Sequence, residues 1–410
     1  MSTVILSINA GSSSLKTTLY GYGKEKQLKS LAKAEVSSIN SQPAQLKYTS
    51  SATQDKQDVD NIKDHKAAFE RVLDAFLNDG SLKEVQSKND IRYACHRVVQ
   101  GGDFHEDQLI TKETFDKIEA LEDLAPLHNK SAVDLMLACH EHLPNVTNVA
   151  CFDSAFHHTM PEHVKSYMID QKVAKEKGLR KYGFHGLSYS YILRTVAGHL
   201  GKPKEDTSII ALHLGSGASA CAMRKGKSID TTMGLTPVSG LPGGTRSGDV
   251  DPALIFHYTS EASKLSPSST KDLHISTAEE ILNKKSGWKA VAGTSNFAEI
   301  AKSDASQESQ LALDIFIDRI VGFVGNYYVK LGGDVDAIVF AGGIGEKSAM
   351  LRKMVIEKVS CLGFTVDDQK NEYLEEGTIV TIGEHDTKKT LVCQTDEDYE
   401  MAYNTMMHPK

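Results

Sequence analysis

Three short turns rich in glycine and serine each follow an apolar, strand-like run. They are residues 9–14 (NAGSSS), 215–219 (GSGAS) and 341–346 (AGGIGE). Small residues let successive backbone N–H groups approach an anion closely, so such turns are typical of phosphate-binding loops. Residues 341–346 lack the G-x-G-x-x-G spacing of a dinucleotide fold, and residues 11–16 lack the spacing of a P-loop. These turns therefore disfavour a Rossmann oxidoreductase and a P-loop NTPase.

Two arginines stand in loops flanked by glycine, Arg97 before GG and Arg246 within GGTRSGD. A guanidinium in such a loop can present its rigid fork to a phosphate or a carboxylate, although a single one is more often a surface charge. Asp153, His185 and the acidic residues 396–398 are candidates for holding a metal or contacting a reacting oxygen. A histidine beside apolar neighbours is, however, more often a packed core residue than a catalyst, and an acidic cluster is more often a solvated surface.

The elements that must position these residues repeat along the chain. Strand-like runs at 4–8 and 15–20 flank the first turn, and the segment 207–223 repeats the same strand, turn and strand. Two copies of one unit about half a chain apart indicate two domains built on related plans. Helical spacing over 311–331 is followed by a strand at 336–340 and a glycine-rich turn, which favours an α/β fold.

Three further segments complete the expected organisation. Apolar residues recur at helical spacing over 67–78, and Gly80 follows, so an amphipathic helix is expected there. Residues 37–60 are rich in Ser, Gln and Asp without a sustained period, which predicts turns or an exposed hairpin. Residues 260–271 are expected to form a surface loop between two helical pieces.

Composition excludes several classes of protein. The 410 residues carry 46 Lys and Arg against 54 Asp and Glu, a formal charge of -8, with 40% hydrophobic residues. This is ordinary for a globular protein of two or three domains, and it disfavours a nucleic-acid binder or a membrane-surface protein. The six cysteines show no metal-binding or disulfide pattern, so buried free thiols and a cytoplasmic location are expected. The N-terminus does not resemble a signal peptide.

Taken together, these segments resemble the acetate kinase family essentially from end to end. The stretches that match are INAGSSSLK (8–16), HRVVQGG (96–102), APLHNKSA (125–132), FDSAFHHTMP (152–161), YGFHGLS (182–188), HLGSGAS (213–219), GLTP (234–237), GTRSGDVDPA (244–253), LNKKSG (282–287), GGIGE (342–346) and TDED (395–398). The resemblance implies the duplicated ribonuclease H-like fold of sugar kinases, Hsp70 and actin, with two βββαβαβα-type domains around a central cleft. It also implies that residues 1–154 and 396–410 form an N-terminal acetate kinase domain with a returning helix. Residues 155–395 would form a C-terminal domain for nucleotide binding and dimerisation.

The implied reaction is reversible, Mg²⁺-dependent phosphoryl transfer from ATP to acetate, giving acetyl phosphate and ADP, with Mn²⁺ as an alternative metal. By match to the family's motifs, Arg97 holds the carboxylate, and Arg246 and His185 stabilise the transferring phosphoryl group. Asp153 is the essential carboxylate that orients Arg246 or the acetate, and Asn9 and Glu397 serve the metal. The residues matched to the nucleotide and phosphate side are Ser12, Ser14, Lys16, His128, His213, Gly215, Ser216, Gly217, Asn296, Gly343 and Gly345.

A small apolar pocket should set the size of the substrate, since one extra methylene changes binding by only about 1–3 kcal/mol in such a site. The positions matched to this pocket are Val99, Leu127, Phe184 and Pro237. Their bulk favours acetate over propionate, and a propionate kinase is an alternative. The resemblance also implies a homodimer.

The sequence departs from the family pattern mainly on the nucleotide side. Ser216 replaces an asparagine, residues 294–299 read TSNFAE where the family commonly reads SSDMRD, and Lys347 replaces an asparagine. Leu187 and Tyr189 replace Thr and His, and residues 242–243 replace two methionines. These changes leave pyrophosphate or another nucleotide open as the phosphoryl donor. A non-catalytic, actin-like nucleotide-binding module is the alternative from a different class, and the arginine expected at acetate speaks against it.

Overall fold

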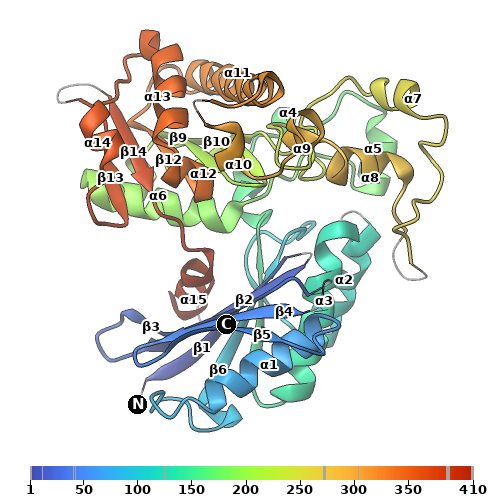
Figure 1. Cartoon of the computed structure of the whole chain (residues 1–410), viewed down its shortest axis with the longest axis vertical. Helices are drawn as coiled ribbons and strands as arrows, with labels where there is room; N and C mark the ends of the chain where they lie inside the picture. Colours follow the sequence, from blue (N-terminus) through green and yellow to red (C-terminus); the bar gives the residue numbers. More distant parts are fainter. Residues whose placement is uncertain are drawn as a thin grey trace. The chain divides into compact units, whose positions relative to one another are not determined.

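The chain folds into two compact units. The computed structural model describes residues 2–11, 13–39, 41, 43–123, 126–270, 274–302, 304–384 and 388–407, without the side chains of 123 and 126–128. The first unit comprises Met1–Ala155 together with Asp396–Lys410, and the second comprises Phe156–Thr395. The C-terminal segment therefore returns to the unit that the N-terminus forms (Figure 1).

A mixed sheet forms the centre of the first unit, with the strand order β5-β4-β3-β2-β1-β6-β8-β7. Its strands are β1 (Thr3–Ala10), β2 (Ser14–Tyr22), β3 (Leu28–Ser37), β4 (Ala44–Ser50), β5 (Gln54–Val59), β6 (Ile91–Val98), β7 (Gln108–Leu109) and β8 (Thr147–Phe152). β1 pairs antiparallel with β2 but parallel with β6, and β6 pairs parallel with β8. The carboxyl ends of β1, β6 and β8 consequently lie at one edge of the sheet.

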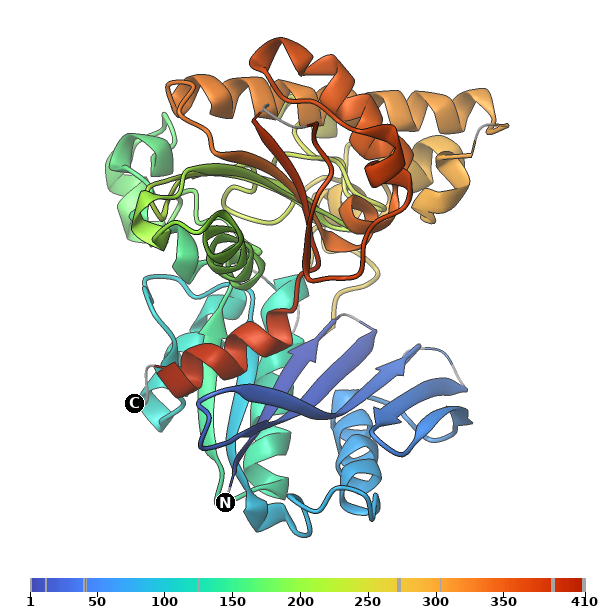
Figure 2. The ribbon, with the colours of Figure 1, turned by 90° about the vertical axis from the view of Figure 1, so that its left-hand side faces the viewer.

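Helices cover both faces of this sheet. Along β1, Val4, Leu6 and Ile8 alternate onto the face covered by α1 (His65–Leu77) and α3 (Pro126–His142), where they share one apolar core with both helices. The opposite face carries α15 (Glu397–Met407), seen crossing the strands in Figure 2. A hydrogen bond from Ser7 Oγ to the Asp398 carbonyl, 2.7 Å long, ties α15 to β1.

The second unit also contains a mixed sheet, with the order β11-β10-β9-β12-β14-β13. Its strands are β9 (Ile209–Leu214), β10 (Ala218–Arg224), β11 (Lys227–Thr231), β12 (Ala337–Ala341), β13 (Ile379–Thr381) and β14 (Lys389–Cys393). β9, β10 and β11 form an antiparallel meander, while β12 pairs parallel with both β9 and β14. Strands β9 and β12 are buried on both faces, as their continuous apolar sequences predict.

Two long helices cover one face of the second sheet, α11 (Gln307–Lys330) and α13 (Ala349–Lys358), which share an apolar core with the strands (Figure 1). The other face packs against α6 (Gly186–Leu200). The first unit also contains the α-helix α2 (Lys112–Ala120). The second unit also contains the α-helices α4 (Glu162–Lys165), α5 (Gln171–Lys177), α7 (Leu254–Tyr258), α8 (Thr277–Lys284), α9 (Gly287–Ala292), α10 (Phe297–Ile300), α12 (Gly342–Lys347) and α14 (Asp368–Glu372).

The two units repeat one plan, which confirms the predicted duplicated α/β fold. Each sheet begins with an antiparallel meander of three strands and continues through helical crossovers into two parallel strands. The first unit adds the hairpin β4–β5 to its meander. This hairpin lies within the segment 37–60, for which the sequence predicted either turns or an exposed hairpin. Along β5 the residues before Val59 are exposed and polar, which protects this edge strand from pairing with other chains.

The segment 342–346 differs from its prediction as a turn, because it forms most of α12. Gly342 has φ 73°, and a β-carbon there would lie 2.7 Å from the Leu214 carbonyl oxygen, so the chain turns on this glycine at the first residue of the helix. Five cysteines are buried and Cys361 is exposed, and all six are free thiols. Among the described residues, no helix is both long and apolar enough to cross a membrane.

Candidate active site

An arginine and a buried carboxylate meet at the strand edge of the first unit. Arg97 lies near the end of β6, and Asp153 directly follows β8, the neighbouring parallel strand. Arg97 donates from Nε and Nη2 to Asp153 Oδ2, at 3.1 and 2.6 Å. Asp153 is fully buried, whereas the Arg97 side chain remains 18% exposed. The carboxylate therefore fixes the guanidinium plane while part of the fork faces solvent.

Two further residues complete this cluster. Asn9, at the end of β1, accepts a hydrogen bond from Arg97 Nη1 at 3.2 Å and donates one to Glu397 Oε2 at 3.3 Å. Glu397 Oε2 also lies 3.5 Å from Arg97 Nε. Burial lowers the pKa of Arg97, but the charges of Asp153 and Glu397 outweigh burial and raise it overall. Arg97 thus stays charged, and the carboxylates around it outnumber it.

The returning segment 396–398 is held against the first sheet by its own acidic residues. Thr18 Oγ1 donates to Asp398 Oδ2 at 2.9 Å, and Tyr20 donates its hydroxyl proton to Asp396 Oδ1 at 3.3 Å. Burial and the nearby charges of Asp396 and Glu397 raise the pKa of Asp398 to about 6. The crowding of negative charge is a property that suits a divalent cation. Among the described residues, no group of three or more His, Cys, Asp or Glu side chains could hold a metal by itself.

In the second unit, His185 occupies a strained backbone position at the start of α6. Its φ of 60° and ψ of 25° lie in the left-handed region, which is uncommon for a residue other than glycine. Its ring stacks on that of His213, with 4.2 Å between centroids. His185 Nδ1 hydrogen-bonds to Ser219 Oγ at 2.8 Å, and His213 Nδ1 to Ser188 Oγ at 2.7 Å. Both imidazoles are therefore fixed through their Nδ1 atoms.

Arg246 and His185 converge on the turn between β9 and β10. A β-carbon added to Gly217 would lie 2.8 Å from Arg246 Nη1 and 3.8 Å from His185 Nε2. The arginine loop also packs on this turn, because Gly244 N donates to the Ser216 carbonyl at 2.9 Å. Only glycine at position 217 leaves room for the guanidinium so close to the backbone. The resulting set of donors is suited to an oxyanion or a phosphoryl group.

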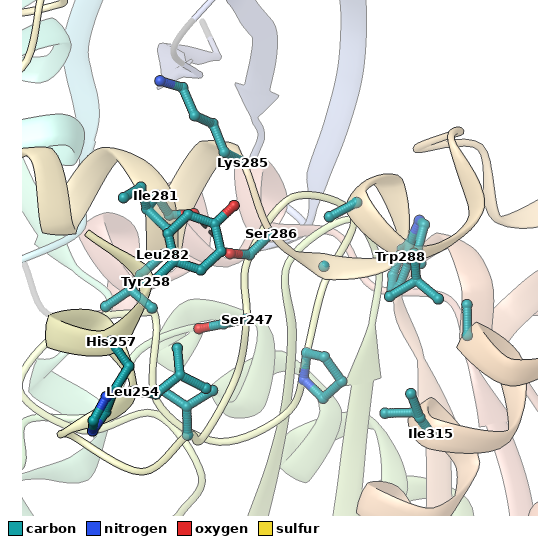
Figure 3. Close-up of a pocket in the computed structure, with 16 residues that line it drawn as sticks. Ser247, Leu254, His257, Tyr258, Ile281, Leu282, Lys285, Ser286, Trp288 and Ile315 are labelled. Carbon is teal, nitrogen blue, oxygen red and sulfur yellow. Dashed lines mark hydrogen bonds between the residues drawn. The ribbon is translucent and has the colours of Figure 1, made fainter. Parts of the chain in front are cut away.

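The loop that carries Arg246 is braced from its other side by the segment 286–288. Ser286 N donates to the Thr245 carbonyl and Trp288 N to the Gly243 carbonyl, both at 3.1 Å. Figure 3 shows Ser247, Ser286 and Trp288 along the wall of a largely apolar pocket of about 550 Å³ next to this loop. The backbone of the arginine loop is thus held by hydrogen bonds on both sides, one to Ser216 and two from the segment 286–288.

The glycine-rich start of α12 presents open backbone beside β9. Among the described residues, no heavy atom outside the neighbouring residues lies within 4 Å of a β-carbon built at Gly343, whereas one built at Gly345 would lie 3.5 Å from the carbonyl carbon of Phe340. Buried Arg352 supports this segment by donating from Nη1 to the carbonyls of Gly345 and Glu346, at 3.0 and 2.8 Å. Gly343 is therefore accessible to a ligand on a backbone that α13 holds rigid.

The segment 294–299, matched to the adenosine side, is built differently from the family pattern. Asn296 caps α10, since its side chain accepts from Ala298 N at 3.1 Å, and it also donates to Glu299 Oε1 at 3.1 Å. Phe297 is 8% exposed and packs edge-on against Trp288 and Phe316. Phe297 belongs to the core and is unavailable to stack on a base, so only exposed Asn296 of this pair could contact a nucleotide.

The remaining predicted residues divide between the units. In the first unit, Lys16 on β2 is exposed and lies 3.9 Å from Glu35, Ser14 begins β2, and Val99 is half-buried. In the second unit, Phe184 and Pro237 are buried, and Gly215 and exposed Ser216 lie in the turn before β10. Ser12 lies outside the described residues, as do the side chains of Leu127 and His128.

Sequence reasoning missed the serines that hold the imidazoles, Ser188 and Ser219. Ser219 lies opposite His213 in the β9–β10 register, and Ser188 follows His185 on the first turn of α6. The strand-turn-strand repeat could have placed Ser219 beside His213, because residues flanking a short turn face each other across a hairpin. No local signal identified Ser188.

Comparisons with known proteins agree along the whole chain. The model of the Acetokinase family matches residues 4–403. A protein of Emericella nidulans named a probable acetate kinase is 56% identical over 407 residues, covering 98% of this chain and 96% of its own. The crystal structure of a propionate kinase from Francisella tularensis superposes with a TM-score of 0.86 at 33% identity, covering 98% of both chains. That of Porphyromonas gingivalis acetate kinase gives 0.84 at 35% identity and covers both chains completely.

Proposed function

The chain belongs to the acetokinase family, and from this premise we propose that it transfers a phosphoryl group reversibly between ATP and acetate. The products are acetyl phosphate and ADP, and the transfer is direct and in line. The observation that carries this proposal is the guanidinium of Arg97, fixed at 2.6 Å by buried Asp153 yet partly open to solvent. Binding of a nucleotide alone would not need a cation held in this way.

Arg97 binds the carboxylate of acetate in this proposal. Asp153 and Asn9 fix its orientation through Nε, Nη2 and Nη1, so the bound acetate is held with one oxygen directed at the phosphoryl group. Such positioning supplies much of the rate of phosphoryl transfer, because the reaction needs little covalent help from the protein. The contact found for Asp153 favours an orienting role toward Arg97.

Arg246 and His185 act on the transferring group. Both converge on Gly217, so a phosphoryl oxygen placed beside this glycine would accept from Nη1 of Arg246 and Nε2 of His185. Preorganised donors of this kind stabilise charge on the equatorial oxygens in the transition state. His213 and the backbone at 215–217 and 343–345 contact the remaining phosphates, together with Ser12, Ser14, Lys16 and His128.

The carboxylates of the first unit fit a magnesium ion. Mg²⁺ is usually bound by one or two carboxylates, several waters and the phosphates of the substrate, so the small protein ligand set is ordinary. Glu397 would hold the ion through water, and Asn9, which already bonds to Glu397 Oε2, fixes that carboxylate. When bound with the polyphosphate, the ion neutralises charge that develops on the phosphate oxygens.

The acceptor pocket is proposed to consist of Val99, Leu127, Phe184 and Pro237, with acetate preferred. Propionate is the second candidate acceptor, since a structural relative at 33% identity is a propionate kinase. A pocket of this kind discriminates one methylene by about 10- to 200-fold. Comparison of kcat/KM for acetate and propionate tests the preference, and equal values would contradict it.

ATP is the proposed donor, with pyrophosphate or another nucleotide as the alternative. The alternative is favoured by exposed Asn296, which is engaged by Glu299, and by Ala298, which offers no side chain for a base. A panel of ATP, GTP and pyrophosphate, each with acetate and Mg²⁺, decides this point when acetyl phosphate is trapped as a hydroxamate. Turnover with pyrophosphate and none with ATP would overturn the proposed donor.

Variants of the two arginines test the proposed roles. Arg97→Ala should mainly raise KM for acetate, whereas Arg246→Ala should collapse kcat in both directions, because it removes a donor to the transition state. Lys353→Ala, which removes an exposed cation of α13 that pairs with Asp368, is the control. Near-normal activity of both arginine variants would show that the roles are wrongly assigned.

We further propose that residues 1–154 with 396–410 form the acetate domain, and that 155–395 form a domain for nucleotide binding and dimerisation. On α7, the side chains of Leu254, Phe256 and Tyr258 are 42%, 72% and 63% exposed. Two of them also line the apolar pocket in Figure 3. Apolar surface of this kind commonly marks an interface between proteins, and we assign it to a second copy of the chain.

Light scattering on the full chain tests the proposed homodimer. Phe256→Glu should convert dimers to monomers, while Tyr373→Glu, at an equally exposed aromatic residue of the same unit, should leave dimers intact. A monomeric wild-type protein, or dimers that survive Phe256→Glu, would contradict the assigned face.

A further inference from the structure

A chain of hydrogen bonds leads from the core of the second unit to His185. The Tyr189 hydroxyl lies 2.5 Å from Ser219 Oγ, and Ser219 Oγ lies 2.8 Å from His185 Nδ1. Tyr189 and Ser219 are both fully buried. Their side chains come from α6 and β10, the two elements that also carry His185 and the turn at Gly217.

The direction of these bonds follows from the surroundings of Tyr189. Burial and the nearby Cys221 raise the pKa of its phenol well above the ordinary value, so the hydroxyl keeps its proton. In the contact between the Tyr189 and Ser219 hydroxyls, either oxygen could donate. The phenol is the stronger acid of the two, so its proton is directed to Ser219 Oγ.

Ser219 then has its own proton left to donate. A hydroxyl that accepts from a tyrosine donates most favourably to its second neighbour, which here is His185 Nδ1. A neutral imidazole that accepts at Nδ1 carries its proton on Nε2. That Nε2 atom is the one that lies near Gly217 together with Arg246 Nη1.

We propose that Tyr189 and Ser219 are positioning residues that hold His185 in the tautomer with its proton on Nε2. In this form the ring donates to a phosphoryl oxygen. The opposite tautomer would direct a lone pair at that oxygen and repel it. The proposal rests on the proposed function in one respect, since it takes His185 as a donor to the transferring group.

The stacked ring of His213 strengthens the arrangement. Its Nδ1 is held by Ser188 at 2.7 Å, so both stacked rings are anchored at corresponding nitrogen atoms. The family's usual sequence has histidine where this chain has Tyr189. This chain therefore supplies the proton donor from a phenol, a group that keeps its proton across the working range of pH.

The tautomer is measured directly by ¹H–¹⁵N correlation spectra of the full chain labelled at histidine. His185→Gln identifies the signal, and the ¹⁵N shifts of Nδ1 and Nε2 report which atom carries the proton. The wild-type protein should show the proton on Nε2. Tyr189→Phe and Ser219→Ala should each introduce the other tautomer, and Tyr189→His, which restores a donor, should recover the wild-type shifts.

Kinetics supply the second readout. Tyr189→Phe and Ser219→Ala should lower kcat about three- to tenfold, the range expected for the net loss of one hydrogen bond, with KM for acetate and ATP unchanged. Tyr327→Phe is the matched control, because Tyr327 is a buried tyrosine of the same unit whose hydroxyl has no hydrogen-bond partner among the described residues. It should alter neither the shifts nor kcat. Thermal unfolding of each variant checks that the fold is retained.

The outcomes separate this inference from the proposed function. Unchanged His185 shifts in both Tyr189→Phe and Ser219→Ala would overturn the inference, whatever their activity. Full activity of His185→Ala would instead overturn the proposed role of His185 in transfer. Should Ser219→Ala fail to fold, Tyr189→Phe still decides the inference, because it removes one oxygen and keeps the ring.

Discussion

The substitution Asp153→Asn isolates the contribution of one negative charge to the first unit's site. Asparagine keeps the shape of the side chain, so the buried position is still filled and an amide oxygen can still face Arg97. The wild-type oxygen Oδ2 accepts two bonds from Arg97, at 3.1 and 2.6 Å. Both bonds join a charged donor to a charged acceptor, and with asparagine only the donor stays charged.

The expected magnitude follows from these two bonds. Loss of the carboxylate charge removes part of an ion-pair attraction of about 4 kcal/mol, the value for unit charges about 4 Å apart at an effective dielectric constant of about 20, so Arg97 loses about 2–3 kcal/mol of orienting interaction. Since 1.36 kcal/mol corresponds to a factor of ten, kcat/KM for acetate should fall about 30- to 160-fold. The KM for ATP should change less than twofold, because Arg97 is assigned to acetate. Glu397, at 3.5 Å from Nε, retains the charge pairing of Arg97 and limits the loss of stability.

Hydroxamate trapping of acetyl phosphate at varied acetate and saturating ATP measures this effect. Asp79→Asn is the control, since Asp79 is also a carboxylate of the first unit and accepts from the Tyr48 hydroxyl at 2.7 Å. It should leave kcat/KM unchanged. A double variant, Asp153→Asn with Arg97→Ala, should be no worse than Arg97→Ala alone, because the two residues act as a unit. Activity of Asp153→Asn within threefold of wild type, or an equal loss in the control, would refute the assigned role.

Three further predictions concern stability and the nucleotide. Burial lowers the pKa of His96 and of His157 to about 4, so both are neutral in the folded protein. The free energy of unfolding should be highest above pH ~6.5 and should fall by about 3 kcal/mol per histidine as the pH drops to about 4. Urea titrations of His157→Gln should show a fall that is smaller by the contribution of one histidine. A flat profile would contradict this. Gly183→Ala should destabilise the fold by about 2–4 kcal/mol, because Gly183 has φ 78° and an added β-carbon would lie 2.5 Å from Thr231 Cγ2. An unchanged melting temperature would contradict this, since it would mean that the neighbouring residues move aside without cost. Phe297→Leu should cost about 1 kcal/mol of stability with KM for ATP within twofold of wild type, whereas a large rise in that KM would mean that Phe297 contacts the base.

The repeated strand plan could be predicted from the sequence because its signal is local. Apolar runs on both sides of a small-residue turn identify a hairpin without any knowledge of distant contacts. The start of α12 was predicted as a turn for the same reason, since its glycines lower helix propensity. The helix forms nonetheless, because buried Arg352 holds the carbonyls of Gly345 and Glu346 from the next helix. That contact depends on tertiary packing and leaves no local trace.

The contacts between side chains inside the site could not be predicted from the sequence. Arg97 and Asp153 meet because β6 and β8 are adjacent parallel strands, and the order of strands in a sheet does not follow from their patterns. The family resemblance supplied the residue types for catalysis, yet it left the partner of Asp153 open. Tyr189 was noted only as a departure from the family, and its bond to Ser219 depends on how α6 lies on the sheet.

One plan of strands produces two sites of different electrostatic character. In the first unit, Arg97 is surrounded by Asp153 and Glu397, and Asp398 adds further negative charge nearby, so this edge can accept a divalent cation as well as a substrate carboxylate. In the second unit, the corresponding turn gathers Arg246 and His185 around Gly217, with His213 stacked on His185, so donors are presented to an anion. In the proposed function, a few side chains at the ends of equivalent strands assign acetate and metal to the first unit and phosphate to the second. The sequence departures concentrate on the nucleotide side, and substitutions there should therefore alter the choice of donor while leaving the use of acetate intact.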